Sequence, residues 1–210
     1  MPMATHKGAR PHEKEVIKTC IDLALHSVDH GCIFIIDLGG KGGYYTKVYR
    51  SLGTEEGKPL SVLNERDKYI IKHLATMDGA TIIDKNGSMR EFGVTLKKHD
   101  TFFGHGKRHA FALGTSKLKG KICILASEED RHVRIFRDGI CVVDMDAKTH
   151  IPNSLRFKLV EFLEKPLPAA LKSNGIKASV LDSPPIPAMA IITGGTVMLS
   201  EGFERLRYVL

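Results

Sequence analysis

The sequence of 210 residues has no tryptophan, only four cysteines and no long hydrophobic run. Its apolar stretches, such as 33–38 and 121–126, are far shorter than the roughly 20 residues that a membrane-spanning helix needs. The N-terminal segment MPMATHKGARPHEKE also lacks the apolar region of a secretory signal peptide. We therefore expect no membrane partner, a disordered lead-in over residues 1–12, and a cytoplasmic protein.

The few cysteines are far apart and show neither CxxC nor CxxH spacing: Cys20, Cys32, Cys123 and Cys141. Each lies in an apolar stretch, which favours buried free thiols over disulfides or a zinc site. Free thiols persist in a reducing compartment, so this interpretation agrees with a cytoplasmic location.

Positive charge exceeds negative charge, with 31 Lys and Arg against 24 Asp and Glu and a net charge of +7. The excess is concentrated in residues 97–121, which hold seven Lys or Arg and a single acid, Asp100. Such a balance suits a nucleic acid, a nucleotide or merely solvent. Basic residues 117–121 are not interleaved with aromatic residues, so we regard nucleic-acid binding as the weakest of these interpretations.

The apolar pattern predicts an α/β fold over residues 13–150, built as a mixed β-sheet flanked by helices. Helices are expected from Pro11 toward Gly31, after Asn64 to Ala75, and over Gly106–Lys117. Strands are expected at 32–38, 44–50, 80–84, 89–96, 121–127, 132–137 and 140–146.

The composition changes near residue 150, because six of the nine prolines lie in 151–210. We expect an amphipathic helix over 153–164 and two short strands joined around Gly194-Gly195. So many breaks in 60 residues would make a weak independent core. The segment is therefore expected to form a small α+β appendage that packs on the first domain.

Three short segments carry polar groups where strands end or a helix begins: Asp78-Gly79-Ala80, Gly106–Ala110 and Ser127–Glu129. Each alone has an ordinary structural explanation as a turn, a solvated helix face or a cap. Together they supply the complementary parts of a nucleotide site. These parts are a carboxylate for a divalent cation, backbone N–H groups and cations for phosphate, and hydroxyl and carboxylate groups for ribose or base.

In this order and spacing, the three segments resemble the diadenylate cyclase domain, which is found in DNA-integrity-scanning proteins and in membrane-bound bacterial cyclases. The resemblance covers roughly residues 14–146. It implies a mixed α/β domain that joins two ATP molecules into cyclic di-AMP and releases two pyrophosphates. It also implies one ATP in each domain, with two domains facing each other in a homodimer or a higher homo-oligomer.

The resemblance further implies a role for each candidate residue. Asp78 would bind Mg²⁺ or Mn²⁺ and help to polarise the attacking 3′-hydroxyl, while Gly79 and Ala80 would let the backbone lie close to the nucleotide. The remaining candidates would contact the phosphates or line the nucleotide pocket: Gly106, Lys107, Arg108, His109, Ser127, Glu128 and Glu129. Among all of these, Asp78, Arg108 and His109 are the expected catalytic residues.

The helical segment departs from the family at two positions. The family usually has Gly-Thr-Arg-His-Arg-Ala-Ala, whereas residues 106–112 of this chain are GKRHAFA. Lys107 replaces the threonine and Ala110 replaces the second arginine. Residues three apart share a helix face, so Lys107 could restore the lost positive charge as a point charge without the arginine fork. Two hypotheses follow: an active cyclase, or a catalytically inactive domain of the same fold that senses ATP or cyclic di-AMP.

Overall fold

The computed structural model describes residues 11–40, 42–47, 57–102, 104–148, 159–161, 163, 189–193, 196–201 and 204–208. The helices of the first 150 residues are α1 (Pro11–Leu25), α2 (Glu65–Ala75) and α3 (Lys107–Ser116). The strands of the first 150 residues are β1 (Cys32–Asp37), β2 (Tyr45–Thr46), β3 (Ala80–Asp84), β4 (Met89–Leu96), β5 (Lys121–Ala126), β6 (His132–Arg137) and β7 (Ile140–Asp146). Three more follow: β8 (Met189–Thr193), β9 (Thr196–Glu201) and β10 (Glu204–Tyr208).

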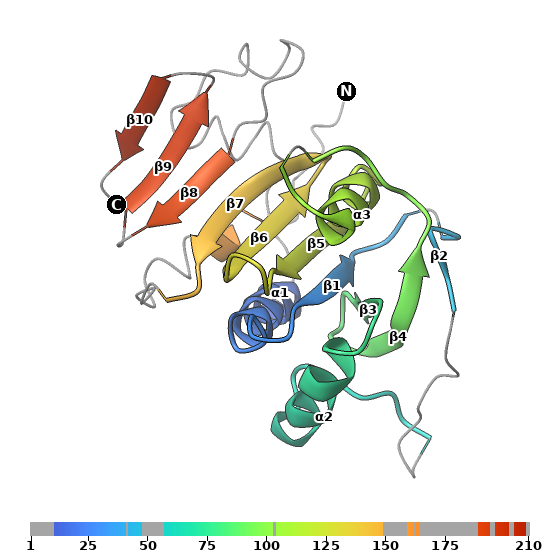
Figure 1. Ribbon diagram of the computed structural model, residues 1–210. Helices are drawn as coiled ribbons and strands as arrows, with labels where there is room; N and C mark the ends of the chain where they lie inside the picture. Colours follow the sequence, from blue (N-terminus) through green and yellow to red (C-terminus); the bar gives the residue numbers. More distant parts are fainter. Residues whose placement is uncertain are drawn as a thin grey trace, which may run out of the picture.

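The strands form one sheet with the order β10-β9-β8-β7-β6-β5-β1-β3-β4-β2 (Figure 1). At its centre β1 runs parallel to β3 and antiparallel to β5, and β4 runs antiparallel to β3. The sheet is therefore mixed, and the predicted fold class is confirmed.

Helices cover both faces of this sheet (Figure 1). Successive side chains of a strand point to opposite faces, and β1 divides in this way. Phe34 and Ile36 belong to the core beneath α1 and α2, while Ile33 and Ile35 pack with Ala112 of α3 on the other face. Because both faces are covered, β1 has a continuous apolar sequence rather than an alternating one.

The first helix is shorter than predicted. It ends at Leu25, and a turn fills residues 26–30 before Gly31, where the sequence pattern had extended the helix. The Ser27 hydroxyl donates to the Leu23 carbonyl at 2.7 Å, and the Gly31 N–H donates to the Ser27 carbonyl at 3.0 Å. Local side-chain bonds of this kind compete with helix continuation.

Beyond residue 150 the structure describes three strands and the helical residues 159–161 and 163. The two strands expected around Gly194-Gly195 are β8 and β9, and a further strand, β10, pairs with β9. β8 pairs in parallel with β7, so these strands continue the main sheet. Most of the helix expected over 153–164 lies outside the described residues.

All four cysteines are buried free thiols, as predicted. Burial raises the pKa of the Cys32 thiol to about 12. Among the described residues, no helix has both the length and the apolar character needed to cross a membrane.

Candidate functional site

The strand directions bring the three predicted segments to one edge of the sheet. Since β1 and β3 run opposite to β4 and β5, the starts of the first pair lie beside the ends of the second. Asp78 precedes β3, Ser127 follows β5, and the first turn of α3 lies above the same edge. Strand-end loops of this kind are where α/β folds build their sites.

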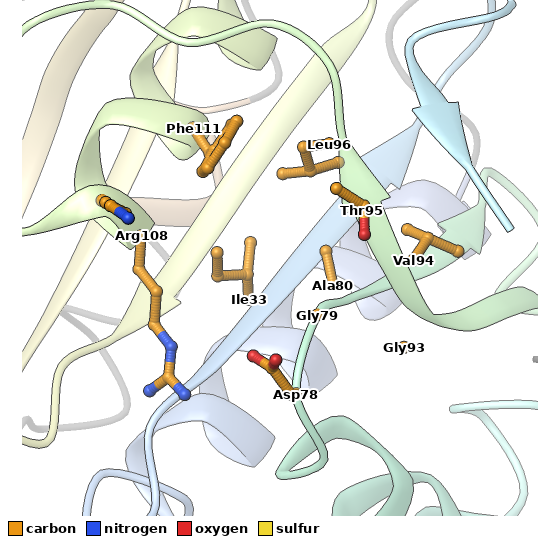
Figure 2. Close-up of a pocket in the computed structure, with 11 residues that line it drawn as sticks. Ile33, Asp78, Gly79, Ala80, Gly93, Val94, Thr95, Leu96, Arg108 and Phe111 are labelled. Atoms are coloured by element: carbon orange, nitrogen blue, oxygen red, sulfur yellow. The ribbon is translucent and has the colours of Figure 1, made fainter. Parts of the chain in front are cut away.

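A cavity of about 340 Å³ opens at this edge (Figure 2). Asp78, Gly79 and Ala80 line one side of it, and Lys107 and Arg108 line the other. Figure 2 shows Asp78, in the turn before β3, and Arg108, on α3, directed toward the same space. Its apolar lining consists of Ile33, Ala80, Val94, Leu96 and Phe111.

A second cavity of about 320 Å³ adjoins the first. It is lined by Gly106, Lys107, Arg108, His109, Leu125, Ser127, Glu128 and Glu129. Lys107 and Arg108 line both cavities, so the start of α3 forms their common wall. The structure thus places all ten predicted site residues around two adjoining cavities.

The start of α3 is open to an anion. Its N-cap, Gly106, has no side chain to bond the free N–H groups, and the first turn contains no acid. Instead it carries Lys107 and Arg108, both exposed. The unpaired N–H groups and the positive end of the helix dipole favour phosphate here, and the two cations strengthen that preference.

Gly79 fixes the position of Asp78. Its φ is +108°, and a Cβ at this position would lie 2.5 Å from the carbonyl carbon of Gly93. Gly93 has a φ of +57° and lies where the β3–β4 register shifts. The two backbones therefore touch at a β-bulge. Sequence analysis did not single out Gly93, although a glycine inside an apolar strand is a known sign of a bulge.

His109 lines the second cavity beside Arg108, but unlike Arg108 it is buried. His109 is only 3% exposed, and its ring stacks on that of Phe102 with an interplanar angle of 3°. Nε2 accepts a hydrogen bond from Nη1 of Arg134 at 2.9 Å. Burial first, and then the charge of Arg134, lowers the pKa of His109 to about 4, so the ring is neutral at pH 7.

Arg134 and its partners were missed by sequence analysis. Nε of Arg134 donates to Asp144 at 3.0 Å, and Nη2 donates to Asp130 at 2.5 Å. Nδ1 of His132 lies 2.6 Å from the other carboxylate oxygen of Asp144. The available signal was an arginine between the apolar residues Val133 and Ile135, since buried charges are normally paired.

The two departures at the start of α3 occupy different surroundings. Lys107 lines both cavities together with Arg108, whereas Ala110 is among the lining residues of neither. The half-buried Ala110 instead accepts a backbone hydrogen bond from Asp100 through its carbonyl, at 2.9 Å. At the first cavity, the helical neighbour of Lys107 is Phe111, four residues on.

A divalent cation has one candidate ligand on the first cavity. Asp78 is exposed, and within the described part of the chain it makes no hydrogen bond or ion pair. The same part contains no group of three His, Cys, Asp or Glu side chains that could hold a metal by themselves. Magnesium usually keeps several waters and binds one or two carboxylates plus substrate phosphates, so a lone carboxylate beside an anion site fits that ion.

The family model described as "DisA bacterial checkpoint controller nucleotide-binding" (DAC) matches residues 24–141, which is more than half of the chain. The chain belongs to the DAC family. The matched range contains every residue that lines the two cavities. The resemblance inferred from the three segments is thereby confirmed.

A curated relative supports the same assignment. The chain is 35% identical over 98 residues to a protein of Methanocaldococcus jannaschii named diadenylate cyclase. The match covers 45% of this DAC-family chain and 32% of the relative, so the chain spans about a third of that protein's length.

Two solved structures match part of the chain. One is described as a hypothetical membrane spanning protein from Bacillus cereus, with 18% identity, a TM-score of 0.48, and 60% of this chain and 61% of that chain covered. The other is a double cysteine mutant of DacA from Staphylococcus aureus, with 18% identity, a TM-score of 0.44, and coverage of 70% and 94%.

Proposed function

We propose that this DAC-family protein is a diadenylate cyclase that condenses two ATP molecules into cyclic di-AMP and two pyrophosphates. The observation that carries the proposal is the convergence of all ten candidate residues on two adjoining cavities at one sheet edge. Each protomer would hold one ATP, and two sites would face each other in a homodimer or a higher homo-oligomer.

The start of α3 would bind the triphosphate. The free N–H groups after Gly106, with Lys107 and Arg108, supply positive charge where the phosphates gain negative charge during the reaction. The 3′-oxygen of one ATP attacks the α-phosphorus of the other, the bond from this phosphorus to the bridging oxygen of pyrophosphate breaks, and the hydroxyl proton passes to solvent. The same step in the opposite direction closes the ring. Two reactants held in line in this way react as if at very high concentration.

Asp78 would act at the 3′-hydroxyl. Its carboxylate lines the first cavity opposite Arg108 and is free to hold Mg²⁺ or Mn²⁺. A bound ion of this kind lowers the pKa of a coordinated hydroxyl and neutralises charge on phosphate oxygens. Gly79 supports this role because its contact with Gly93 fixes the turn that carries the carboxylate.

The second cavity would hold polar parts of the nucleotide. Ser127, which is buried, and the exposed Glu128 and Glu129 offer a hydroxyl and two carboxylates to ribose or base. The apolar lining of the first cavity, with Phe111 and Leu96, offers a surface for the remaining apolar area of a nucleotide.

Product analysis tests the proposal. The protein is incubated with ATP and Mg²⁺ or Mn²⁺, and the products are separated by HPLC and identified by mass spectrometry. We expect cyclic di-AMP and pyrophosphate, and loss of both on addition of EDTA. Asp78→Asn should lower the rate by about 100-fold or more, because it removes the anionic ligand.

Asp138→Asn is the matched control. Asp138 is another exposed aspartate, it lies outside both cavities, and it has a φ of +52° that asparagine tolerates. This variant should retain the wild-type rate. Absence of cyclic di-AMP at high protein concentration, or equal rates for Asp78→Asn and the wild type, contradicts the proposal.

A second candidate function is a sensor of ATP or cyclic di-AMP without turnover. It is favoured by Ala110, which stands where the family has a second arginine and which lines neither cavity. Isothermal titration calorimetry separates the two functions. Tight binding of either nucleotide by a protein that forms no product supports the sensor.

A further inference from the structure

A single buried arginine connects two of the three segments around the cavities. The side chain of Arg134, on β6, is only 5% exposed. Its three guanidinium nitrogens donate to three different elements: Nη1 to His109 on α3, Nη2 to Asp130 in the turn after β5, and Nε to Asp144 on β7. A planar guanidinium fixes the directions of these bonds relative to one another.

The bond to His109 anchors the first turn of α3. Arginine has only donors, so Nε2 of His109 must accept and Nδ1 must carry the ring proton. This turn has no side-chain cap and carries two exposed cations, so little else in its own sequence stabilises it. Phe102 stacks on the face of the same ring, with centroids 5.7 Å apart.

The bond to Asp130 anchors the opposite wall. Oδ2 of Asp130 accepts from Arg134, and Oδ1 accepts from the backbone N–H of His132 at 3.3 Å. Burial alone would raise the pKa of Asp130. Hydrogen bonds from Arg134 and from the Ser127 hydroxyl instead hold this pKa well below its usual range. Asp130 thus ties the turn that carries Glu128 and Glu129 to β6. The Ser127 N–H also donates to the His132 carbonyl of this strand, at 2.8 Å.

Asp144 completes the charge balance. Arg134 and Asp144 are directly opposite each other in the β6–β7 register, so their ion pair is built into the sheet. A buried guanidinium needs this compensation, because an unpaired charge in the interior is strongly destabilising. Two carboxylates therefore hold the arginine while its remaining nitrogen bonds His109.

We propose that Arg134 is a positioning residue that sets the distance between the start of α3 and the Ser127–Asp130 turn. At this distance Arg108 and Ser127 contact the same nucleotide. The proposal rests on the proposed nucleotide site. It assigns Arg134 no contact with substrate: the residue acts through His109 and Asp130.

The test compares two variants. Arg134→Lys keeps the charge, but one ammonium cannot satisfy His109, Asp130 and Asp144 together. We expect kcat/KM for ATP to fall by about tenfold to hundredfold, as small displacements of reacting groups do. Asp130→Asn keeps an acceptor for Arg134 but weakens the charge-assisted bond, and should lower kcat/KM in the same direction by a smaller factor. Asp130 is 35% exposed, so this second variant remains informative if Arg134→Lys fails to fold.

Lys121→Met is the matched control. Lys121 is another buried cation, 1% exposed, and it pairs with Asp37 at 2.5 Å near the opposite edge of the sheet. This variant should lose thermal stability yet keep the wild-type kcat and KM at temperatures where it is folded. If the Arg134 and Asp130 variants show wild-type kcat/KM, or change only in proportion to their loss of thermal stability as the control does, Arg134 is merely structural and the inference is wrong.

Calorimetry with ATP separates this inference from the proposed function. If the wild type makes no cyclic di-AMP, the proposed cyclase activity fails by itself. Weaker ATP affinity in the Arg134 variant then supports positioning, whereas equal affinity overturns it. A wild type that does not bind ATP at all overturns both.

Discussion

The guanidinium group of Arg108 lies against the backbone of Gly31. A Cβ at position 31 would lie 2.4 Å from Nη1 of Arg108, and 3.5 Å from both the carbonyl oxygen of Ala126 and the Cβ of Glu128. Gly31 has a φ of +65° and directly precedes β1. The turn before the central strand therefore supports the guanidinium group of Arg108, a residue that lines both cavities.

We predict that Gly31→Ala weakens ATP binding by about tenfold, because the methyl group occupies the place of the Arg108 guanidinium. The positive φ adds about 1 kcal/mol of strain. Gly43→Ala is the control, since Gly43 also has a positive φ, +79°, but no atom lies within 4 Å of its Cβ position. Calorimetry with ATP and urea unfolding measure the two effects. Equal ATP affinities of the two variants would show that the contact between Gly31 and Arg108 does not position the guanidinium for ATP.

A second glycine substitution tests the position of Asp78. Gly79→Ala places a Cβ 2.5 Å from the backbone carbonyl carbon of Gly93, which no side-chain adjustment can relieve. We expect a loss of more than about 1 kcal/mol in the free energy of unfolding. The turn that carries Asp78 must also shift, so the rate of cyclic di-AMP formation should fall more than ATP affinity does.

Gly87→Ala provides the comparison for that variant. Gly87 also has a positive φ, +86°, and its added Cβ would meet the side chains of Leu63 and Val16, neither of which lines a cavity of the site. It should lose stability to urea but retain the wild-type rate where it is folded. A full rate for Gly79→Ala would contradict the role given to the Gly79–Gly93 contact.

The positions of the main strands followed from the sequence, because burial on both faces gives continuous apolar runs such as CIFIID, and β3, β4, β6 and β7 begin and end where predicted. The candidate residues followed from polar groups placed at strand ends. The contacts that hold these candidate residues in place could not be predicted from the sequence. Gly31 with Arg108, and Arg134 with His109, join residues far apart in the chain, and only strand register and helix placement bring them together.

The sequence also predicted which residues form the candidate site, but not the directions in which their side chains point. Adjacent residues of one helix point about 100° apart, so the side chains of Arg108 and His109 necessarily have different surroundings. Which of the two is exposed and which is buried depends on how α3 packs on the sheet. The helix buries Ala112 and Leu113, and this packing leaves Arg108 exposed and His109 inside.

Lys107 offers a test of the cation that replaces the family threonine. It is exposed and lines both cavities, so Lys107→Ala should weaken ATP binding by about threefold to tenfold, and more strongly at low salt. Lys119→Ala removes an exposed lysine that lines neither cavity and should have no such effect. Ala110→Arg should not rescue Lys107→Ala, because position 110 is not on the lining. Rescue would show that the two positions do share a face toward the phosphates.

The buried His109 predicts a loss of stability in mild acid. Its pKa is about 4 in the folded protein, against an ordinary value of 6.5. Between these values the unfolded chain binds a proton that the folded protein does not, so the free energy of unfolding falls as the pH falls. The stabilisation is complete above about pH 6.5 and should decrease by about 2 kcal/mol between pH 7 and pH 5.

Urea unfolding at pH 7, 6 and 5 measures this slope. His109→Gln should flatten it, since the amide oxygen can accept from Arg134 without titrating. His105, whose pKa is also lowered by burial and by Arg134, contributes a slope of the same sign, so only the double variant with His105→Gln should approach a flat profile. The carboxylates Asp100 and Asp130, whose pKa values are lowered, lose their contributions at still lower pH and leave this window clear. An unchanged slope in His109→Gln would mean that the ring is not held neutral by the Arg134 network.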